Sequence, residues 1–289
     1  MAEKIRQVNL EDNSILMLRD VSSDREIVSI DIDQTSGRYL TVEPFDADGL
    51  YGGRVVIHPS SEQMTINEPV ELQFGSSRFG GLYYPLDAKF DYVRRKVWIA
   101  DTGNDRILKA DLDSEGIDIA VNNIAYPHAI AVNLNNGGAF IKAYTSRNME
   151  FGSVYYYKSS GEQLSAFSYD LRDAVSSSSS SFSGPGSSSS SSMEIVIPLL
   201  PLSSSIVYDH VRFRAWWVQQ TKIYMLDEKN NQIQVYDISS DWFFDATSVE
   251  IELSTGNAFV VAEDVHAQKY LLQMSRDNNK LLGSAYIVG

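Results

Sequence analysis

The sequence predicts an all-β protein, a β-propeller of five or six four-stranded antiparallel blades in a single domain over residues 1–289. Three observations predict this fold. Short apolar segments that end in an acidic or amide residue recur five times, and an aromatic-led second segment follows each of them after a turn. Third and fourth segments then complete most units; the second and third units repeat after about 42 residues, as do the fourth and fifth, and the other two intervals are longer. Four short strands in a period of about 40–50 residues are typical of propeller blades.

The first two segments of each unit have the spacing of a strand, a turn and a second strand. The first segments are Val28–Asp31, Ala88–Asp91, Ile130–Asn133, Ile206–Asp209 and Thr247–Glu250. The second segments begin seven to nine residues after these ends, at Tyr39, Trp98, Phe140, Trp216 and Phe259. We therefore expect each pair of segments to form an antiparallel hairpin.

Further segments extend most units to four strands. They are Arg106–Asp111, Asp118–Val121, Ser153–Tyr157, Gln163–Ser168, Lys222–Asp227, Gln232–Tyr236, Lys269–Met274 and Lys280–Val288. At the start of the chain, Lys4–Leu10 and Ser14–Arg19 flank Glu11–Asn13 and predict a hairpin within residues 1–20. This hairpin would complete a blade begun at the other end of the chain, which leaves five and six blades as alternatives.

One stretch departs from this composition. Residues 176–192 are almost all serine, around Phe182 and Gly184–Gly186. Such a tract cannot bury enough apolar surface to order itself, and it is typical of a flexible linker. We expect a serine-rich insertion between the third and fourth blades, where added chain length has a small effect on stability.

The second unit carries a family motif. Tyr84-Pro85 precedes its first segment, and Ala100-Asp101-Thr102-Gly103-Asn104-Asp105-Arg106-Ile107 follows. This resembles the NHL repeat, which has a proline before the first strand and an Ala-Asp-x-Gly-Asn-x-Arg-Ile core. The third unit keeps Tyr126-Pro127 but has Lys142-Ala-Tyr-Thr in place of the core. The resemblance implies an NHL-like propeller and leaves the activity open, because propellers have many functions.

The motif residues Asp101, Gly103, Asn104 and Arg106 have a structural explanation. Asp101 ends the second strand of its blade and the next three residues make the turn, where glycine accepts unusual backbone angles and Asn binds backbone groups. Arg106 is expected to reach Asp101 across the hairpin. We interpret this motif as part of the scaffold.

Composition excludes several classes of function. The chain has no cysteine, which excludes disulfides and cysteine-based metal sites. Its net charge of -14 repels phosphates, so we expect no nucleic-acid binding. The most apolar stretch, Ile195–Leu202, is too short to span a bilayer, so we expect no insertion into a membrane. No apolar run follows Met1–Arg6, which predicts synthesis in the cytoplasm without a signal peptide and leaves the final location open.

Histidines are the first candidates for metal chemistry, and the chain has four: His58, His128, His210 and His266. The NHL resemblance implies that lyases of this kind hold a channel metal with histidines that follow the blade proline. His128 follows Pro127, and Asp245 stands at an equivalent position, so both are candidate channel-mouth ligands. One such histidine is too few for a three-ligand zinc site. We therefore predict no metal, no cofactor and no catalytic residue.

Adjacent aromatic residues suggest a contact surface. Neighbouring residues of a strand face opposite sides of a sheet, so one ring of each pair is expected to face a partner. The candidate interface aromatics are Tyr84, Tyr156, Trp217 and Trp242. Packing of both rings between blades is the alternative.

These observations favour a non-enzymatic propeller that acts as a protein–protein interaction or structural subunit of a larger assembly, through a protein partner or self-assembly. A serine tract in a cysteine-free chain suits a virion structural component, such as a phage tail or capsid-associated protein. Two alternatives stay open. One is a channel-mouth enzyme of the metal-dependent lyase or hydrolase type, or a glycan-active enzyme; the other is a ligand-binding sensor domain.

Overall fold

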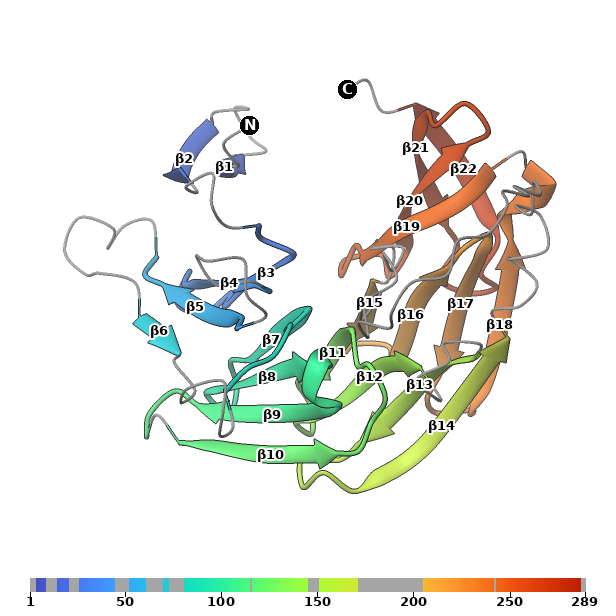
Figure 1. Ribbon diagram of the computed structural model, residues 1–289. Coiled ribbons are helices and arrows are strands. Elements are labelled where there is room, and N and C mark those ends of the chain that lie inside the picture. Colours follow the sequence, from blue (N-terminus) through green and yellow to red (C-terminus); the bar gives the residue numbers. More distant parts are fainter. Residues whose placement is uncertain are drawn as a thin grey trace, which may run out of the picture.

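The computed structural model describes residues 4–8, 15–20, 26–44, 52–60, 70–72, 81–114, 116–144, 151–170, 205–241 and 243–286. Within these residues the chain forms five four-stranded antiparallel sheets and a separate two-stranded sheet. The sheets follow one another around a common axis as the blades of a propeller (Figure 1). The predicted all-β propeller is therefore confirmed, with five four-stranded blades.

Each blade is a continuous stretch of chain. Blade 1 contains β3 (Ser29–Ile32), β4 (Tyr39–Glu43), β5 (Arg54–His58) and β6 (Val70–Leu72). Blade 2 contains β7 (Asp87–Asp91), β8 (Lys96–Asp101), β9 (Arg106–Asp111) and β10 (Ile117–Asn122), with the 3₁₀ helix η1 (Thr102–Asn104) between β8 and β9. Blade 3 contains β11 (Ala129–Asn133), β12 (Gly138–Tyr144), β13 (Phe151–Tyr157) and β14 (Gln163–Asp170).

The last two blades repeat this plan. Blade 4 contains β15 (Ile206–Asp209), β16 (Arg214–Gln219), β17 (Lys222–Asp227) and β18 (Gln232–Asp237), and the 3₁₀ helix η2 (Ile238–Asp241) follows it. Blade 5 contains β19 (Phe243–Ile251), β20 (Ala258–Asp264), β21 (Lys269–Met274) and β22 (Leu281–Tyr286). The two-stranded sheet pairs β1 (Lys4–Val8) with β2 (Ile15–Asp20), as expected for the N-terminal hairpin.

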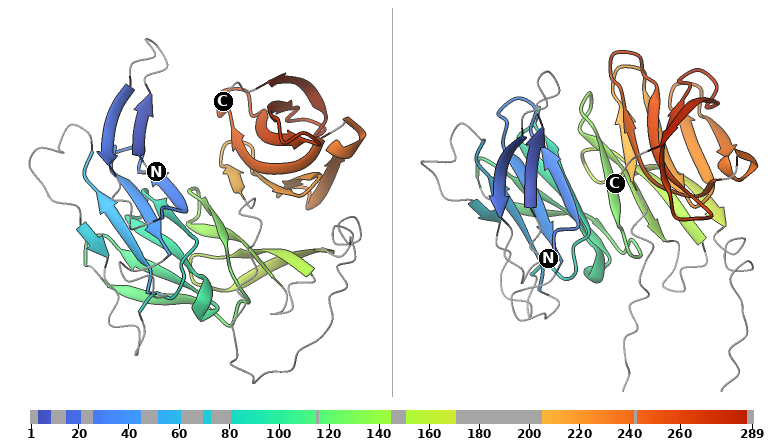
Figure 2. Two further views of the ribbon diagram at one scale, coloured as in Figure 1. Left: turned by 45° about the horizontal axis from the view of Figure 1, so that its top comes forward. Right: turned by 90° about the horizontal axis from the view of Figure 1, so that it is seen from above.

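The first strand of each blade lies nearest the axis. From β3 through β7, β11 and β15 to β19, each first strand contacts the first strand of the next blade. The β1–β2 hairpin and blade 5 lie on the two sides of an opening in the ring (Figures 1 and 2). The closing role expected for residues 1–20 stays a prediction, and the serine-rich tract lies outside the described residues.

Four apolar cores hold the blades together. Each core packs side chains of two consecutive blades, from blades 1 and 2 through to blades 4 and 5. The aromatic residues that lead three second strands, Trp98, Phe140 and Trp216, are completely buried in these cores. Among the residues that the structure describes, no corresponding core joins blade 5 to blade 1. Tight packing of such clusters accounts for the order of the first strands around the axis.

The turns after the first strands correct the expected register of two units. Asp33 accepts the Thr35 amide hydrogen at 2.9 Å, as Asp209 accepts that of Val211 at 3.0 Å. The fifth unit has Glu252 in this place, since Gly256 N–H donates to its carbonyl just as Gly37 N–H donates to that of Asp33. The first segments of units one and five therefore extend two residues beyond the predicted ends at residues 31 and 250.

Candidate functional site

With the register corrected, five equivalent residues face the propeller axis. Two positions before each turn residue stand Asp31, Lys89, Ala131, Val207 and Glu250, and all five line one cavity of about 220 Å³. One residue from each following turn also lines it: Gln34, Tyr92, Leu134, His210 and Leu253. The cavity therefore lies on the axis, with its mouth at the end of the propeller where these turns gather. We call this end the turn-end surface.

Charges meet inside the cavity. Lys89 Nζ lies 3.7 Å from Asp87 Oδ1, and the Lys89 side chain is 27% exposed. Burial by itself lowers the pKa of Lys89, but the carboxylates of Asp87, Asp31 and Glu250 together raise it above its usual value. Asp31 belongs to blade 1 and Glu250 to blade 5, so the ammonium of one lysine interacts with carboxylates from three blades.

The carboxylates at the cavity are incompletely balanced. Burial raises the pKa of both Asp31 and Glu250, while the ammonium of Lys89 opposes the change in each. Each carboxylate also feels like charge: Asp87 raises the pKa of Asp31, and Asp31 raises that of Glu250. The phenol of Tyr92 at the mouth shows the same acidic potential, since burial and then the charges of three aspartates raise its pKa. The site therefore favours added positive charge.

Asp87 lies beside Lys89 in this charged cluster and is held by two hydrogen bonds. Its Oδ1 accepts the Ser29 hydroxyl at 2.6 Å, and its Oδ2 accepts the Ile130 amide hydrogen at 2.7 Å. These bonds join blade 2 to blades 1 and 3 beside the axis. Because a buried carboxylate needs such donors, we assign Asp87 the role of positioning the neighbouring Lys89.

Two arginines hold the mouth of the cavity in place. Arg94 donates to the carbonyls of Leu134 and Asn135 in blade 3, each at 3.0 Å. Arg212 repeats this contact on the blade 5 turn, where it donates to the carbonyls at positions 253 and 254 at 3.0 and 3.1 Å. Asn135 completes the series by donating to the carbonyl of His210 at 2.6 Å. The turns of blades 2 to 5 therefore form one connected rim.

The NHL-type motif lies away from this cavity and supports the scaffold. Asp101 is completely buried, and its carboxylate accepts the Tyr83 amide at 2.8 Å, Asn104 Nδ2 at 2.8 Å and Arg106 Nε at 2.6 Å. Gly103 is required by space, because a Cβ there would lie 2.0 Å from Cδ1 of Tyr83. The network fixes the β8–β9 connection to the segment before β7.

The predicted channel-mouth ligands do not line the axial cavity. His128 precedes β11 and Asp245 lies near the start of β19, whereas the cavity lies along the later parts of these strands. Nδ1 of His128 contacts the carbonyl of Tyr126 at 3.0 Å. Burial, and then the charge of Lys142, lower the pKa of His128 to about 3. Its ring is therefore neutral, and the charge that acts on it is that of a lysine.

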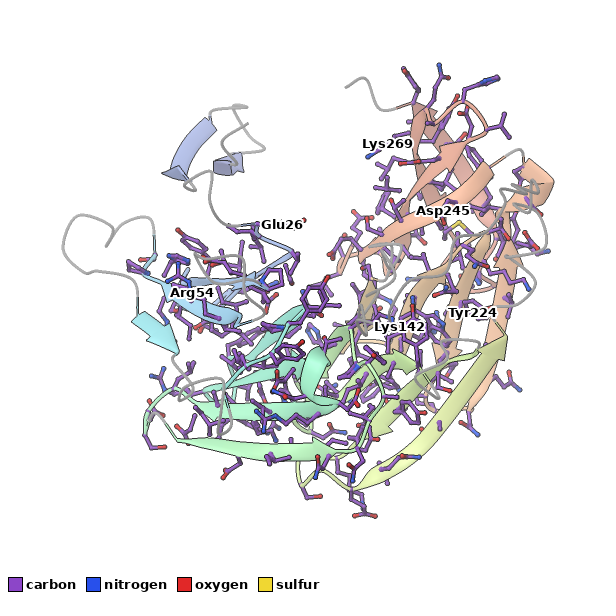
Figure 3. The ribbon with its side chains drawn as sticks, viewed as in Figure 1. Glu26, Arg54, Lys142, Tyr224, Asp245 and Lys269 are labelled. Carbon is purple, nitrogen blue, oxygen red and sulfur yellow. The ribbon has the colours of Figure 1, made fainter. Side chains whose placement is uncertain are left out.

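Lys142 is a feature that the sequence analysis did not identify. Its side chain is completely buried, with Nζ donating to the carbonyl of Val218 in blade 4 at 2.6 Å. Burial lowers its pKa to about 7, while the carboxylate of Asp245 acts in the opposite direction. Figure 3 shows Lys142 and Asp245 among the side chains of blades 3 to 5. This ammonium connects two blades from inside the protein.

The interface aromatics need correction. Tyr156 and Trp217 are buried in the core between blades 3 and 4, so neither faces a partner. The ring next to Tyr156, Tyr157, packs in the core between blades 2 and 3. Each face of a blade packs on a neighbouring blade, so both adjacent rings are buried between blades. Tyr84 is partly buried, and Trp242 lies outside the described residues.

The described part of the chain contains no group of three or more histidine and acidic residues that could hold a metal ion. The helices in that part are too short to cross a membrane. The histidines also differ from expectation in one respect: His210, which the sequence did not place at the channel, lines the mouth of the axial cavity. His58 is buried and bonds Thr41 Oγ1 through Nε2 at 3.0 Å.

No protein-family model matches the chain. No curated protein matches it either. A solved chain from a crystal structure of a nidogen/laminin complex is similar in fold, with a TM-score of 0.64 and 12% sequence identity. The match covers 99% of this chain and 91% of that chain. A likeness at this identity shows the propeller fold, and the NHL resemblance stays a prediction.

Proposed function

We propose that this propeller is a non-catalytic subunit that binds a protein partner, or copies of itself, within a larger assembly. The observation that carries the proposal is the turn-end surface. Four large apolar side chains are exposed there around the cavity mouth: Ile32 (53%), Val93 (58%), Val211 (55%) and Leu253 (40%). Apolar groups gathered within a polar rim are typical of protein interaction sites.

The rim also has the rigidity that an interaction surface needs. Val93 and Val211 stand next to Arg94 and Arg212, whose contacts with the following blades fix the turns. A surface that is already in its binding conformation loses less conformational entropy on association. The similar fold of a chain from a nidogen/laminin complex is consistent with a protein partner.

A virion structural component, such as a phage tail or capsid-associated protein, is the specific form of this role that we propose. Its support is compositional: a serine-rich insertion and the absence of cysteine in an acidic chain. Such a component would be incorporated into a particle together with the products of neighbouring genes.

Light scattering on a sizing column, with the chain alone and co-expressed with those neighbours, tests the proposal. We expect a stable assembly that is weakened by Val93→Asp and Val211→Asp. Val265→Asp is the matched control, because Val265 is 70% exposed in the turn between β20 and β21. A chain that stays a 32.3 kDa monomer in every combination would contradict the proposed function.

A further inference from the structure

The axial cavity and the surface around it differ in chemistry. Asp31 and Glu250 line the cavity together with Lys89, whose ammonium is also paired with Asp87 at 3.7 Å. Four exposed apolar side chains, those of Ile32, Val93, Val211 and Leu253, stand around the mouth beside polar residues such as Gln34. A ligand complementary to both would have a positive charge at its centre and apolar groups on either side.

We propose that the cavity receives the lysine or arginine side chain of a partner protein, while apolar residues on either side of it contact the turn-end surface. This inference rests on the proposed function and states the chemistry of the partner. The inserted cation would lie between Asp31 and Glu250, which stand on blades 1 and 5 and share Lys89 as their counter-ion. Charge-assisted hydrogen bonds to the two carboxylates would hold it.

The size of the cavity favours one side chain over a free small molecule. Sites for small ligands usually measure about 300–1,000 Å³. This cavity of about 220 Å³ is smaller, and residues of all five blades line it. A long side chain with a terminal cation fits such a space, and the partner's main chain would then cross the mouth.

Other ligands fit the site less well. A phosphate or a carboxylate would meet the carboxylates of Asp31 and Glu250 and one ammonium that Asp87 already partly neutralises, which is net repulsion. A divalent metal would lie next to Lys89, and the described residues contain no cluster of metal ligands. A cationic side chain avoids both conflicts, and its apolar neighbours would bury Val93, Val211 and Leu253.

The rim also explains why an extended segment suits the surface. The mouth is formed by turns from five blades, and the arginine contacts keep four of these turns at fixed positions. Val93 and Val211 come from blades 2 and 4, so they contact the segment at separate points around the mouth. A peptide with one central cation and an apolar residue on each side matches this arrangement.

Selection from a random 12-residue peptide library displayed on phage tests the inference. On the wild-type chain we expect enriched peptides with a lysine or arginine flanked by apolar residues. The double variant Asp31→Asn/Glu250→Gln should bind those peptides at least about tenfold more weakly, since both cavity carboxylates are lost. Asp118→Asn, which removes an exposed carboxylate on β10, is the control and should bind them as the wild type does.

A second variant tests the direction of the effect. Lys89→Met removes the counter-ion and leaves the carboxylates unbalanced, so it should bind a selected cationic peptide more tightly than the wild type. Circular dichroism and thermal unfolding verify that each variant is folded. Weaker binding by a folded Lys89→Met protein would overturn the inference, as would a peptide set without a basic residue or no enrichment at all.

The outcomes separate this inference from the proposed function. Peptides that bind equally well to the double variant would show a binding surface elsewhere, so the partner chemistry would be wrong while an interaction role survived. Peptides that bind the Val93→Asp variant more weakly but bind Asp31→Asn/Glu250→Gln as they bind the wild type would show that the turn-end surface binds them and that the cavity does not. Light scattering decides separately whether the chain assembles.

Discussion

Replacing Lys142 with methionine should stabilise the protein near neutral pH and destabilise it at high pH. Burial lowers the pKa of Lys142 to about 7 from 10.5, so holding the charged amine inside the folded state costs about 4 kcal/mol at pH 7. This cost is fully present below pH 7 and disappears as the pH rises towards 10.5. Lys142→Met removes it but also removes the hydrogen bond to the Val218 carbonyl, worth about 1–3 kcal/mol.

The variant should therefore be more stable than the wild type by about 1–3 kcal/mol at pH 7, and equal or less stable at pH 10. Urea unfolding followed by tryptophan fluorescence at pH 7, 8.5 and 10 measures the difference. Lys269→Met, which changes a lysine 59% exposed, is the matched control and should show no such trend. A stability difference between Lys142→Met and wild type that stays constant across these pH values would refute the reasoning.

Three further predictions concern the scaffold. Gly103→Ala should lower the free energy of unfolding by more than about 2 kcal/mol, measured by urea unfolding, because its Cβ would meet Tyr83. Arg94→Ala should lower it by about 1–2 kcal/mol, whereas Arg95→Ala, an exposed arginine paired with an exposed aspartate, should change it by less than about 0.5 kcal/mol. His128→Gln should remove a loss of stability in acid. Because the pKa of His128 in the folded state is about 3, below its usual 6.5, the free energy of unfolding of the wild type should fall by about 3 kcal/mol between pH 7 and pH 4. The variant should not show this fall. Equal acid sensitivity of the two proteins would contradict this last prediction.

The blades were predictable because strand periodicity and turn residues are local properties of the sequence. Within every unit a short apolar segment, a turn and a second apolar segment follow one another at similar spacing, and no long-range contact is needed to see them. The contact between Arg106 and Asp101 was predictable for the same reason, since the two residues bond within one hairpin.

The axial cavity was not predicted from the sequence. The five units were compared at the acidic or amide residue that ends each first segment, whereas the equivalent positions are those that pair across each hairpin. Asp31, Lys89 and Glu250 each stand nine residues before their cross-strand partners, and so do Ala131 and Val207. This constant spacing was the signal in the sequence. In the first unit it leads to Leu40, whose neighbour Tyr39 is the aromatic residue that the pattern suggested.

Burial of polar side chains was beyond the sequence. Lys142 stands in a strand between isoleucine and alanine, where lysine is usually exposed. The carbonyl that it binds is 76 residues away, in another blade. The burial of Tyr156 and Trp217 was unpredictable for the same reason. The strand pattern shows on which face of the sheet a ring lies, but it does not show that another blade covers that face.

Four cores between five blades give the propeller the energetics of a linear array. Blades 2, 3 and 4 each rest on two apolar cores, whereas blades 1 and 5 each rest on one among the described residues. In such an array stability is transmitted between nearest neighbours, and fraying begins at the ends. Amide exchange should therefore be slowest in the middle blades. The ammonium of Lys89 in blade 2 attracts the carboxylates of Asp31 in blade 1 and Glu250 in blade 5, so a single charge acts on both ends of the array.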